Sequence, residues 1–590
     1  MNQLETEIKY SKRMMGNLIL ESIIDDVPMD MTFNLLGSIE VYRSTQYYES
    51  KNVRISKLPC NEDIVNSLLT VVLIEKRAVP IQNPATKLGF MVGMETPLDA
   101  VKTGAELLAV CTESNLYDVL LQSDGTSILP KYSVDTDTRQ KLDMLQYLPP
   151  MKQVPSPWLN NSQGGWLWER KSVILGKGNH HQLPQALDAL NALQSVAWSI
   201  DSEVLVGENN PNKNMDDQQF LRIASEYIGL PFYFVWRFDK RGRSYSSGYD
   251  LNIQSNEYGK ALMNLSNETV TKEVDNIKIS VANCAGMDKI TWQGRVDWFD
   301  AQGQFETEDW PEPILGRKAI RAYDRALEGK ADGYVMHIDA TASGLQVMAM
   351  LSGCKNTAMA ANMIDPTIRH DVYSDISKSM NSKLGASHQV DRKMTKRPTL
   401  THYYNSKAVP AEVFNEKQLE VFYEVLDDKF HGAEELMHTI NQFWDYGKDH
   451  HQWGLPDGHI ARVPVTHMVD ARIEVDELDH RTFTYRYQKQ EASKNFRSLV
   501  PNVVHSVDAY IAREMVRRTP FDLVHIHDCF VFEPDHLQEV CQTYREIAAE
   551  IAQSDLLSDI LSQLAGRYTP VKKISDDLHL DILNSSYMLS

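Results

Sequence analysis

Hydrophobic and polar positions along the chain predict a mixture of helices and short strands. Residues 184–206 carry apolar side chains at three- and four-residue steps, which predicts a single amphipathic helix. Residues 232–247 begin as an apolar run and end in charged residues, which predicts a strand followed by a turn. The polar stretch 207–219 between them is typical of a loop. Prolines and a Gly-Gly pair in residues 147–165 interrupt both kinds of element, so we expect a domain boundary there.

Two short apolar runs each lead to an aspartate. Residues 334–338 precede Asp339, and helical spacing resumes from Ser343. Residues 521–534 alternate in polarity on both sides of Asp528, which predicts a strand–turn–strand with this aspartate at its tip. An aspartate after a strand is more often a turn residue or a helix cap. Two such carboxylates from separate strands can also hold two Mg²⁺ ions about 3.5–4 Å apart.

A basic segment, residues 391–407, lies between these aspartates. Its ordinary interpretation is a solvated loop, but its place between two carboxylates favours a phosphate site. Arg392, Lys396 and Tyr404 are spaced by four and eight residues, so on a helix they would project from nearly one face. A guanidinium and an ammonium suit a polyphosphate. Pro398 predicts that this helix either bends or begins there.

Composition and charge limit the classes of function. A chain of 590 residues corresponds to several substructures of ~150 residues each. The net charge of −20 argues against coating nucleic acid through bulk positive charge, but not against an enzyme with one basic channel. The six cysteines form no C-x-x-C pair, which argues against a zinc site or a disulfide scaffold. Neither a Walker-type loop nor H-E-x-x-H occurs, and no apolar run suits a membrane span or a signal peptide.

The order of the motifs resembles the single-subunit, bacteriophage-type RNA polymerases, a family of phage and mitochondrial enzymes. The three principal motifs are D-x-x-x-S-G-L-Q from Asp339, R-x-x-x-K-R-x-x-x-x-x-x-Y from Arg392 to Tyr404, and His527–Asp528. Similar blocks occur at DKRGR (239–243), ANCAGMDK (282–289), LPDGHIARV (455–463), VPNVVHSVDA (500–509) and the C-terminal LHLDILNSSYML (578–589). The resemblance covers about residues 150–590.

This resemblance implies an α-rich α/β fold of right-hand polymerase shape, with palm, fingers, a reduced thumb and a small N-terminal domain. We expect an N-terminal region with promoter or partner contacts (1–150), a helical connector with the reduced thumb (151–231), the first part of the palm (232–355), fingers with a specificity hairpin (356–499), and the second part of the palm with the C-terminal tail (500–590). The thumb is expected to be short because few residues separate Val206 from Phe232, where the family has a long helix.

The resemblance also implies a role for each matched residue. Asp339 and Asp528 are expected to hold two Mg²⁺ ions, assisted by the backbone carbonyl of Ala340. The remaining roles are nucleotide binding (Arg392 and Lys396, with Lys396 protonating the pyrophosphate), ribose discrimination (Tyr404 and His505), support of the product end (Arg243 and His527), and further substrate contacts (Asp239, Gly242 and Lys260). Asn405 departs from the family, which usually has glycine there, and Cys529 replaces a serine.

The implied reaction is DNA-templated addition of ribonucleoside monophosphates to an RNA 3′ end, with release of pyrophosphate. The expected partners are a DNA template, the RNA product, ribonucleoside triphosphates and an accessory phage protein for promoter binding or processivity, without a membrane. The expected location is the cytoplasm of an infected bacterium. Three alternatives stay open: a primase that makes short RNAs, a DNA polymerase of the pol I-like family, and an inactive DNA-binding relative. The S-G-L-Q after Asp339, the cysteine after Asp528 and His505 argue against the DNA polymerase.

Overall fold

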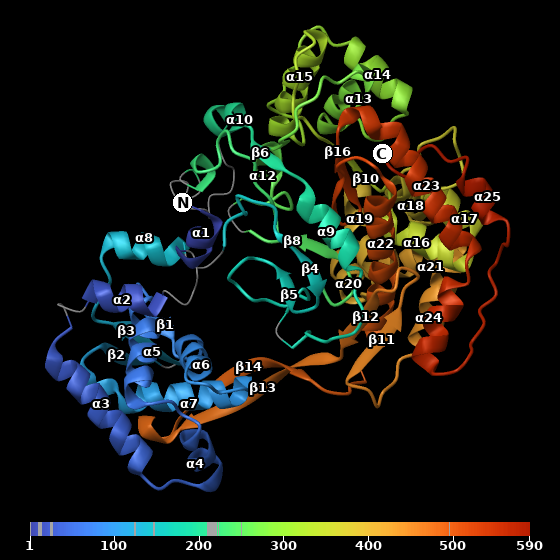
Figure 1. Ribbon diagram of the computed structural model, residues 1–590. Coiled ribbons are helices and arrows are strands. Elements are labelled where there is room, and N and C mark those ends of the chain that lie inside the picture. Colours follow the sequence, from blue (N-terminus) through green and yellow to red (C-terminus); the bar gives the residue numbers. More distant parts are fainter. Residues whose placement is uncertain are drawn as a thin grey trace. The chain divides into compact units, whose positions relative to one another are not determined.

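The chain forms two compact units in the computed structural model (Figure 1). One consists of Gln3–Leu148 with Thr466–Glu491, and the other of Pro149–Val465 with Ala492–Ser590. The division at Leu148 falls inside the predicted boundary of 147–165. The structure describes residues 2–9, 15–23, 27–122, 125–144, 148–176, 178–208, 221, 223–248, 251–494 and 496–590.

The first unit consists of helices around a small sheet. Its helices are α1 (Gln3–Lys9), α2 (Met15–Ile23), α3 (Met29–Ser44), α4 (Glu49–Ser56), α5 (Asn61–Leu73), α6 (Gln82–Met91), α7 (Pro97–Val110) and α8 (Thr136–Met144). Its sheet has the order β1-β3-β2, with β1 (Val79–Pro80), β2 (Tyr117–Gln122) and β3 (Gly125–Pro130). Leu68 and Leu108 are fully buried in the shared core, because α5 and α7 each turn an apolar face inward.

A long hairpin belongs to this same unit. Strands β13 (Thr466–Val475) and β14 (Arg481–Gln490) pair in antiparallel register, and Ile473 and Phe483 enter the core formed by the helices. The resemblance predicts this hairpin within the segment 356–499, whereas the structure groups it with residues 3–148. The grouping follows from side chains on one face of the hairpin, which have their apolar partners on α7.

A buried ion pair ties the hairpin turn to the helices. Lys51 of α4 is fully buried, and its Nζ lies 2.5 Å from Oε1 of Glu477 and 3.8 Å from Oε1 of Glu106. Glu106 also pairs with Arg54 and accepts a hydrogen bond of 2.6 Å from the hydroxyl of Tyr42. The ammonium therefore separates two carboxylates that would otherwise repel each other inside the protein.

The second unit contains the predicted strands that carry the two aspartates. Strands β10 (Met336–Asp339), β16 (Cys529–Phe532) and β15 (Val524–Ile526) form an antiparallel sheet in that order. Helices α16 (Ser343–Ser352), α22 (Leu499–Arg518) and α23 (Leu537–Gln553) pack on one another beside this sheet (Figure 1). The strand before Asp339, the helix from Ser343 and the strand–turn–strand around Asp528 are thus confirmed.

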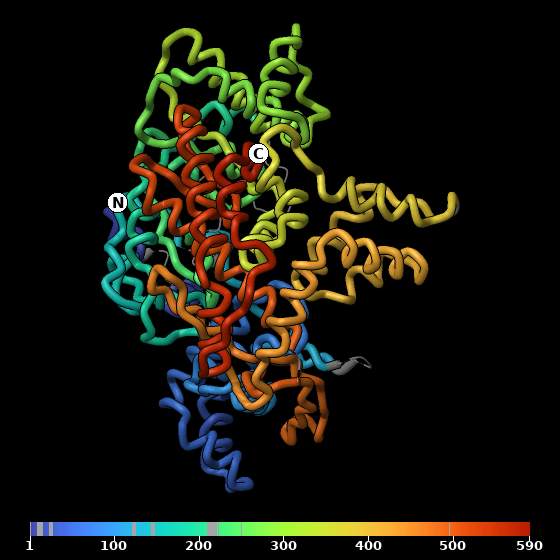
Figure 2. Tube along the Cα trace, turned by 90° about the vertical axis from the view of Figure 1, so that its right-hand side faces the viewer, coloured from blue at the N-terminus to red at the C-terminus, as the bar shows by residue number. Residues whose placement is uncertain are grey.

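Further helices and paired strands complete this unit. The helices are α9 (Leu187–Ser195), α10 (Ser202–Gly207), α12 (Glu257–Ala261), α13 (Val274–Cys284), α14 (Trp292–Asp300), α15 (Pro313–Leu327), α17 (Lys355–Ala360), α18 (Val372–Lys383), α19 (Arg392–His402), α20 (Ala408–Val413), α21 (Glu416–Asn441), α24 (Leu556–Ala565) and α25 (Leu578–Ile582). The strand pairs are β4 (Ser156–Asn160) with β5 (Gln163–Gly165), β6 (Trp198–Ile200) with β9 (Met263–Leu265), β7 (Trp236–Phe238) with β8 (Ser244–Ser246), and β11 (His450–Gly454) with β12 (Ile460–Pro464). Helices α18 and α21 pack together and extend side by side, yellow and orange in Figure 2. Over the described ranges, no helix combines the length and the apolar character that a membrane crossing needs.

The prediction of one continuous helix over 184–206 is wrong. Helix α9 ends at Ser195, and strand β6 follows and pairs with β9. A second helix, α10, then begins with Asp201 as its N-cap, whose carboxylate accepts hydrogen bonds of 3.1 and 3.0 Å from the next backbone N–H groups. Most of the predicted loop over 207–219, and the middle of the short thumb segment, lie outside the described residues.

Candidate functional site

Asp339 and Asp528 line one cavity of about 630 Å³ in the second unit. Asp339 is the last residue of β10, and Asp528 lies in the two-residue turn between β15 and β16. Asp339 pairs with Cys529 across the sheet, and the backbone N–H of Ala340 donates to the carbonyl of Asp528 over 3.0 Å. The strand register therefore brings together two carboxylates that are far apart in the sequence.

The electrostatics of this pair favour a bound cation. The surrounding protein withdraws Asp339 from bulk water, and the Asp528 carboxylate lies close to it, and both effects raise the pKa of Asp339. A divalent cation between the two carboxylates would offset their repulsion, and oxygen ligands of this kind suit Mg²⁺. The residues present therefore fit a divalent metal site.

Basic side chains line the same cavity. They are Lys260, Lys289, Arg369, Arg392 and Lys396. In the part of the chain that the structure describes, Lys260 and Lys396 form neither an ion pair nor a side-chain hydrogen bond, and Arg369 has no carboxylate partner. Cations without acidic partners beside paired carboxylates form a site for a polyanion that also carries metal.

Helix α19 positions two of these cations. Asp391 is its N-cap and accepts a hydrogen bond of 2.8 Å from the N–H of Met394. Arg392 and Lys396 lie one turn apart and reach the same cavity, as their spacing predicts. The helix runs through Pro398 to His402 and so does not begin at the proline.

Tyr404 does not share the helical face of Arg392 and Lys396. Helix α19 ends at His402, and the N–H of Tyr404 donates to the carbonyl of Thr401 over 3.1 Å in the turn that follows. Asn405 then adopts a left-handed backbone with φ of 63°. The prediction that all three side chains project from one helical face is therefore wrong for the tyrosine.

Tyr404 belongs to a second group of side chains around helix α22. Its ring lies 4.5 Å from the imidazole of His505, measured between centroids. Burial raises the pKa of Tyr404 to about 12, so its hydroxyl stays protonated at neutral pH. Arg243 donates to Oδ2 of Asp508 through Nη2 over 2.7 Å, which fixes the guanidinium against α22. The His527 ring lies 5.0 Å from that of Tyr245. Because His527 precedes Asp528 in the same turn, this second group lies next to the two aspartates.

The DKRGR segment forms a tight turn between β7 and β8. Oδ1 of Asp239 accepts hydrogen bonds of 2.8 Å from the N–H of Arg241 and 3.1 Å from the N–H of Arg243. Gly242 has φ of 95°, and a Cβ there would lie 2.6 Å from Nε2 of His459 and 2.7 Å from Nη1 of Arg513. Only glycine therefore suits this turn.

All of the residues that sequence reasoning selected lie in the second unit. The cavity is lined by Asp339, Ala340, Asp528, Lys260, Arg392 and Lys396, and the second group contains Tyr404, His505, His527, Asp239, Gly242 and Arg243. The C-terminal segment also reaches the cavity, because the N–H of Ser590 donates to the carbonyl of Asp339 over 2.9 Å.

Sequence reasoning missed several charged residues on the cavity wall, among them Arg369 and Asp371. Asp371 accepts a hydrogen bond of 2.6 Å from Nε of Arg392, whose guanidinium lies 5.5 Å from the ring centre of Tyr373. Arg369 donates from Nε to Oγ of Ser590 over 3.3 Å. Both residues directly precede helix α18, in a segment whose hydrophobic residues show no helical or strand periodicity. A charged residue just before a helix normally indicates only where the helix begins.

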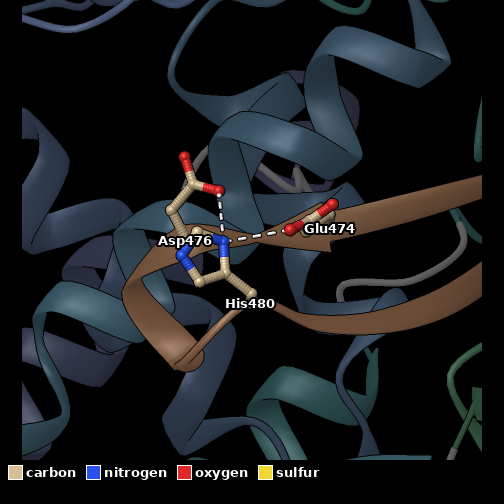
Figure 3. A group of neighbouring side chains, drawn as sticks. All are labelled: Glu474, Asp476 and His480. Carbon is tan, nitrogen blue, oxygen red and sulfur yellow. Dashed lines mark hydrogen bonds and ion pairs between the residues drawn. The ribbon is translucent and has the colours of Figure 1, made fainter.

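A separate group of potential metal ligands lies at the turn of the β13–β14 hairpin. Nδ1 of His480 is 3.0 Å from Oε1 of Glu474 and 3.4 Å from Oδ1 of Asp476 (Figure 3). Of the residues that the structure describes, these are the only three whose ligand atoms converge in this way. All three are exposed and belong to the first unit, and the imidazole is already bound by the carboxylates. The metal prediction therefore depends on Asp339 and Asp528.

Comparison with known proteins gives a consistent result. A family model described as DNA-dependent RNA polymerase matches residues 332–453 and 466–584. The chain is 23% identical over 498 residues to a DNA-directed RNA polymerase of Pseudomonas phage phiKMV, covering 60% of this chain and 61% of the relative. It is 24% identical to a mitochondrial DNA-directed RNA polymerase of Neurospora crassa, covering 51% of this chain and 28% of the relative. It is 21% identical to the mitochondrial DNA-directed RNA polymerase 1 of Arabidopsis thaliana, covering 68% of this chain and 48% of the relative.

These matches confirm the resemblance to the single-subunit RNA polymerases. The first matched range contains Asp339 and the basic helix α19, and the second contains His505 and Asp528. The chain spans less than two thirds of the length of each of these relatives.

Proposed function

We propose that this chain, whose residues 332–453 and 466–584 match the family model for DNA-dependent RNA polymerase, catalyses DNA-templated RNA synthesis. The reaction joins a ribonucleoside monophosphate to an RNA 3′ end and releases pyrophosphate. One observation supports it above all others: the carboxylates of Asp339 and Asp528 share a cavity with Lys260, Lys396 and Arg369, which form no ion pair with any described residue. A cytoplasmic role during phage infection accords with the phage relative.

Asp339 and Asp528, with the carbonyl of Ala340, would hold two Mg²⁺ ions. Bound magnesium would activate the attacking 3′-hydroxyl and stabilise negative charge on the leaving pyrophosphate. The protein supports this by fixing both carboxylates through the β10–β16 register before any substrate binds, so that little reorganisation is needed during the reaction.

Three cations would hold the triphosphate. Arg392 is oriented by Asp371, and Arg369 is held by Ser590, so both guanidinium groups are positioned in advance. Lys396 forms no ion pair with a described residue, so its ammonium is available to donate a proton to the departing pyrophosphate. Tyr404 and His505 would recognise the ribose from their adjoining rings.

In the right-hand arrangement that we propose, the palm is the β10–β16–β15 sheet with α16, α22 and α23. The fingers are α18, α19, α20 and α21. Arg243 and His527 would support the product end, with Asp239, Gly242 and Lys260 contacting the nucleotide and hybrid. A short thumb would grip the hybrid weakly, so we also propose that an accessory protein supplies processivity or promoter contacts. Long transcripts from the purified chain alone under single-hit conditions would refute that part of the proposal.

Extension of an RNA primer on a DNA template tests the main proposal. We expect incorporation from ribonucleotides in Mg²⁺, and a loss of about 10³-fold in Asp339→Asn and Asp528→Asn, because a metal site supplies several kcal/mol to the transition state. Asp559→Asn, an exposed aspartate on α24, is the matched control and should keep full activity.

Thermal melting provides an independent readout of the metal site. Mg²⁺ should raise the melting temperature of the wild type more than that of Asp528→Asn, since the variant keeps only one carboxylate. Undiminished incorporation by Asp528→Asn would overturn the metal assignment. A preference for deoxynucleotides would instead indicate a DNA polymerase, and products of only a few nucleotides would indicate a primase.

A further inference from the structure

The side chain of Arg241 connects the DKRGR turn to helix α22. Its Nε and Nη2 donate to Oδ2 of Asp239 over 2.9 and 2.6 Å. Its Nη1 lies 2.6 Å from Nδ1 of His505. The turn conformation that Gly242 permits therefore directs one N–H of this guanidinium at a ring nitrogen of the histidine.

The chemistry of this contact determines the protonation state of His505. A guanidinium has five N–H donors and no acceptor, so Nδ1 of His505 must accept the hydrogen bond through its lone pair. An imidazole that accepts at Nδ1 is neutral and carries its proton on Nε2. Among the residues that the structure describes, none forms a hydrogen bond with Nε2 of His505, and the ring lies beside that of Tyr404.

We propose that Arg241 is a positioning residue that holds His505 in the neutral tautomer with the proton on Nε2, so that this nitrogen always donates a hydrogen bond to the ribose of the nucleotide. The proposal depends on the function proposed above, in which Tyr404 and His505 recognise the 2′-hydroxyl. In this arrangement, Nε2–H of His505 is the hydrogen-bond donor and the ribose 2′-oxygen is the acceptor. The positioning role also explains why Arg241 forms two hydrogen bonds with Asp239 instead of reaching into the cavity.

The charged and titratable groups around His505 support a neutral ring. Burial, together with Arg243 and Arg241, lowers the pKa of His505 to about 2. Burial also lowers the pKa of the neighbouring His527 to about 4, while Tyr404 stays protonated. Asp508, the partner of Arg243, has its pKa raised to about 6 by burial. Arg241 lowers the pKa of Asp508, so its replacement also shifts the titration of this carboxyl. The ¹⁵N signals of His505 distinguish the imidazole from Asp508.

NMR of the full chain labelled with ¹⁵N in its histidines tests the tautomer directly. The His505 signals are identified by their absence in His505→Gln. We expect the wild type to show the neutral Nε2–H form without titration from pH 6 to pH 8.5. In Arg241→Met, we expect a mixture of tautomers and a pKa nearer the ordinary histidine value of about 6.5. A wild-type His505 that is protonated on Nδ1, or that titrates near pH 6.5, would overturn the proposal.

Kinetics test the consequence for substrate choice. The ratio of kcat/KM for ribonucleotide over deoxynucleotide should be constant over this pH range in the wild type. In Arg241→Met it should fall by roughly five- to tenfold, the effect of losing one oriented hydrogen bond, and it should become pH-dependent. Arg241→Lys restores a donor to Nδ1 and should recover part of the ratio. Arg567→Met removes an exposed arginine and serves as the control.

Two outcomes separate this proposal from the function on which it depends. An unchanged ratio without pH dependence in Arg241→Met would reject the positioning role while leaving polymerase activity in place. Absence of nucleotide incorporation by the wild type would reject the proposed function, whereas the NMR experiment would still decide the tautomer. Equal melting temperatures of wild type and Arg241→Lys establish that the fold is intact.

Discussion

Asn405 stands where the resemblance predicts a glycine, and its side chain has a structural role. It is 8% exposed and has a left-handed backbone with φ of 63°. Its Nδ2 donates to Oδ1 of Asn441 over 3.0 Å and to the carbonyl of Arg497 over 3.1 Å. The amide thus joins the turn after Tyr404 to the end of α21 and to the segment that precedes α22.

Replacement of Asn405 by glycine should therefore destabilise this region even though the backbone conformation suits glycine. Two buried hydrogen bonds are lost, each with a net contribution of about 1 kcal/mol. Greater freedom of the unfolded chain costs about 0.5–1 kcal/mol more. We expect a local loss of about 2–3 kcal/mol. Asn405→Ala loses the same hydrogen bonds and also strains the left-handed backbone by about 1–2 kcal/mol. It should therefore be less stable than Asn405→Gly.

Hydrogen exchange followed by mass spectrometry on peptides covering residues 399–414 measures this loss locally. Global unfolding is unsuitable because a chain of two compact units does not unfold in one step. A loss of 2–3 kcal/mol corresponds to exchange about 30- to 150-fold faster in Asn405→Gly. Exchange within threefold of the wild type, or Asn405→Ala more protected than Asn405→Gly, would refute the reasoning. Ribose selectivity should fall in the same order, because Tyr404 precedes this turn.

Two further predictions concern the charged residues Arg369 and Lys51. Arg369→Gln should raise KM for nucleotides by about 10- to 100-fold with a smaller change in kcat, because a charge-assisted hydrogen bond contributes about 1.5–3 kcal/mol. Steady-state kinetics measure both constants, and a fall in kcat alone would contradict this prediction. Lys51→Met should destabilise the first unit by about 3–5 kcal/mol, because it leaves the Glu477 carboxylate without its buried cation and leaves Glu106 with Arg54 alone. Its melting temperature should be partly restored by adding Glu477→Gln, and an unchanged melting temperature of Lys51→Met would count against the buried pair.

The elements that carry the aspartates could be predicted because their signals are local. A short apolar run bounded by polar residues specifies the strand before Asp339, and alternation on both sides of Asp528 specifies the hairpin. Neither pattern contains the β10–β16 register that brings the carboxylates together. That convergence was predicted only through the resemblance of the motifs to a known family.

Other features could not be predicted because long-range pairing decides them. The residues after Ser195 continue a helical spacing, but Trp198 pairs with Leu265 in the β6–β9 ladder, and this pairing overrides the local preference. The hydrogen bond from Arg241 to His505 joins residues that are 264 positions apart. Sequence spacing carries no information about such a contact, nor about the arrival of Arg369 beside α19.

The membership of the β13–β14 hairpin in the first unit limits how the protein can be shortened. A gene encoding only residues 149–590 would still produce the hairpin, but Ile473, Val475 and Phe483 would lose the apolar surface that now covers them. Such a truncated protein would expose the apolar face of this strand pair to solvent and would be prone to aggregate. Removal of the N-terminal region is therefore compatible with a soluble product only if residues 466–491 are replaced by a short turn in the same deletion.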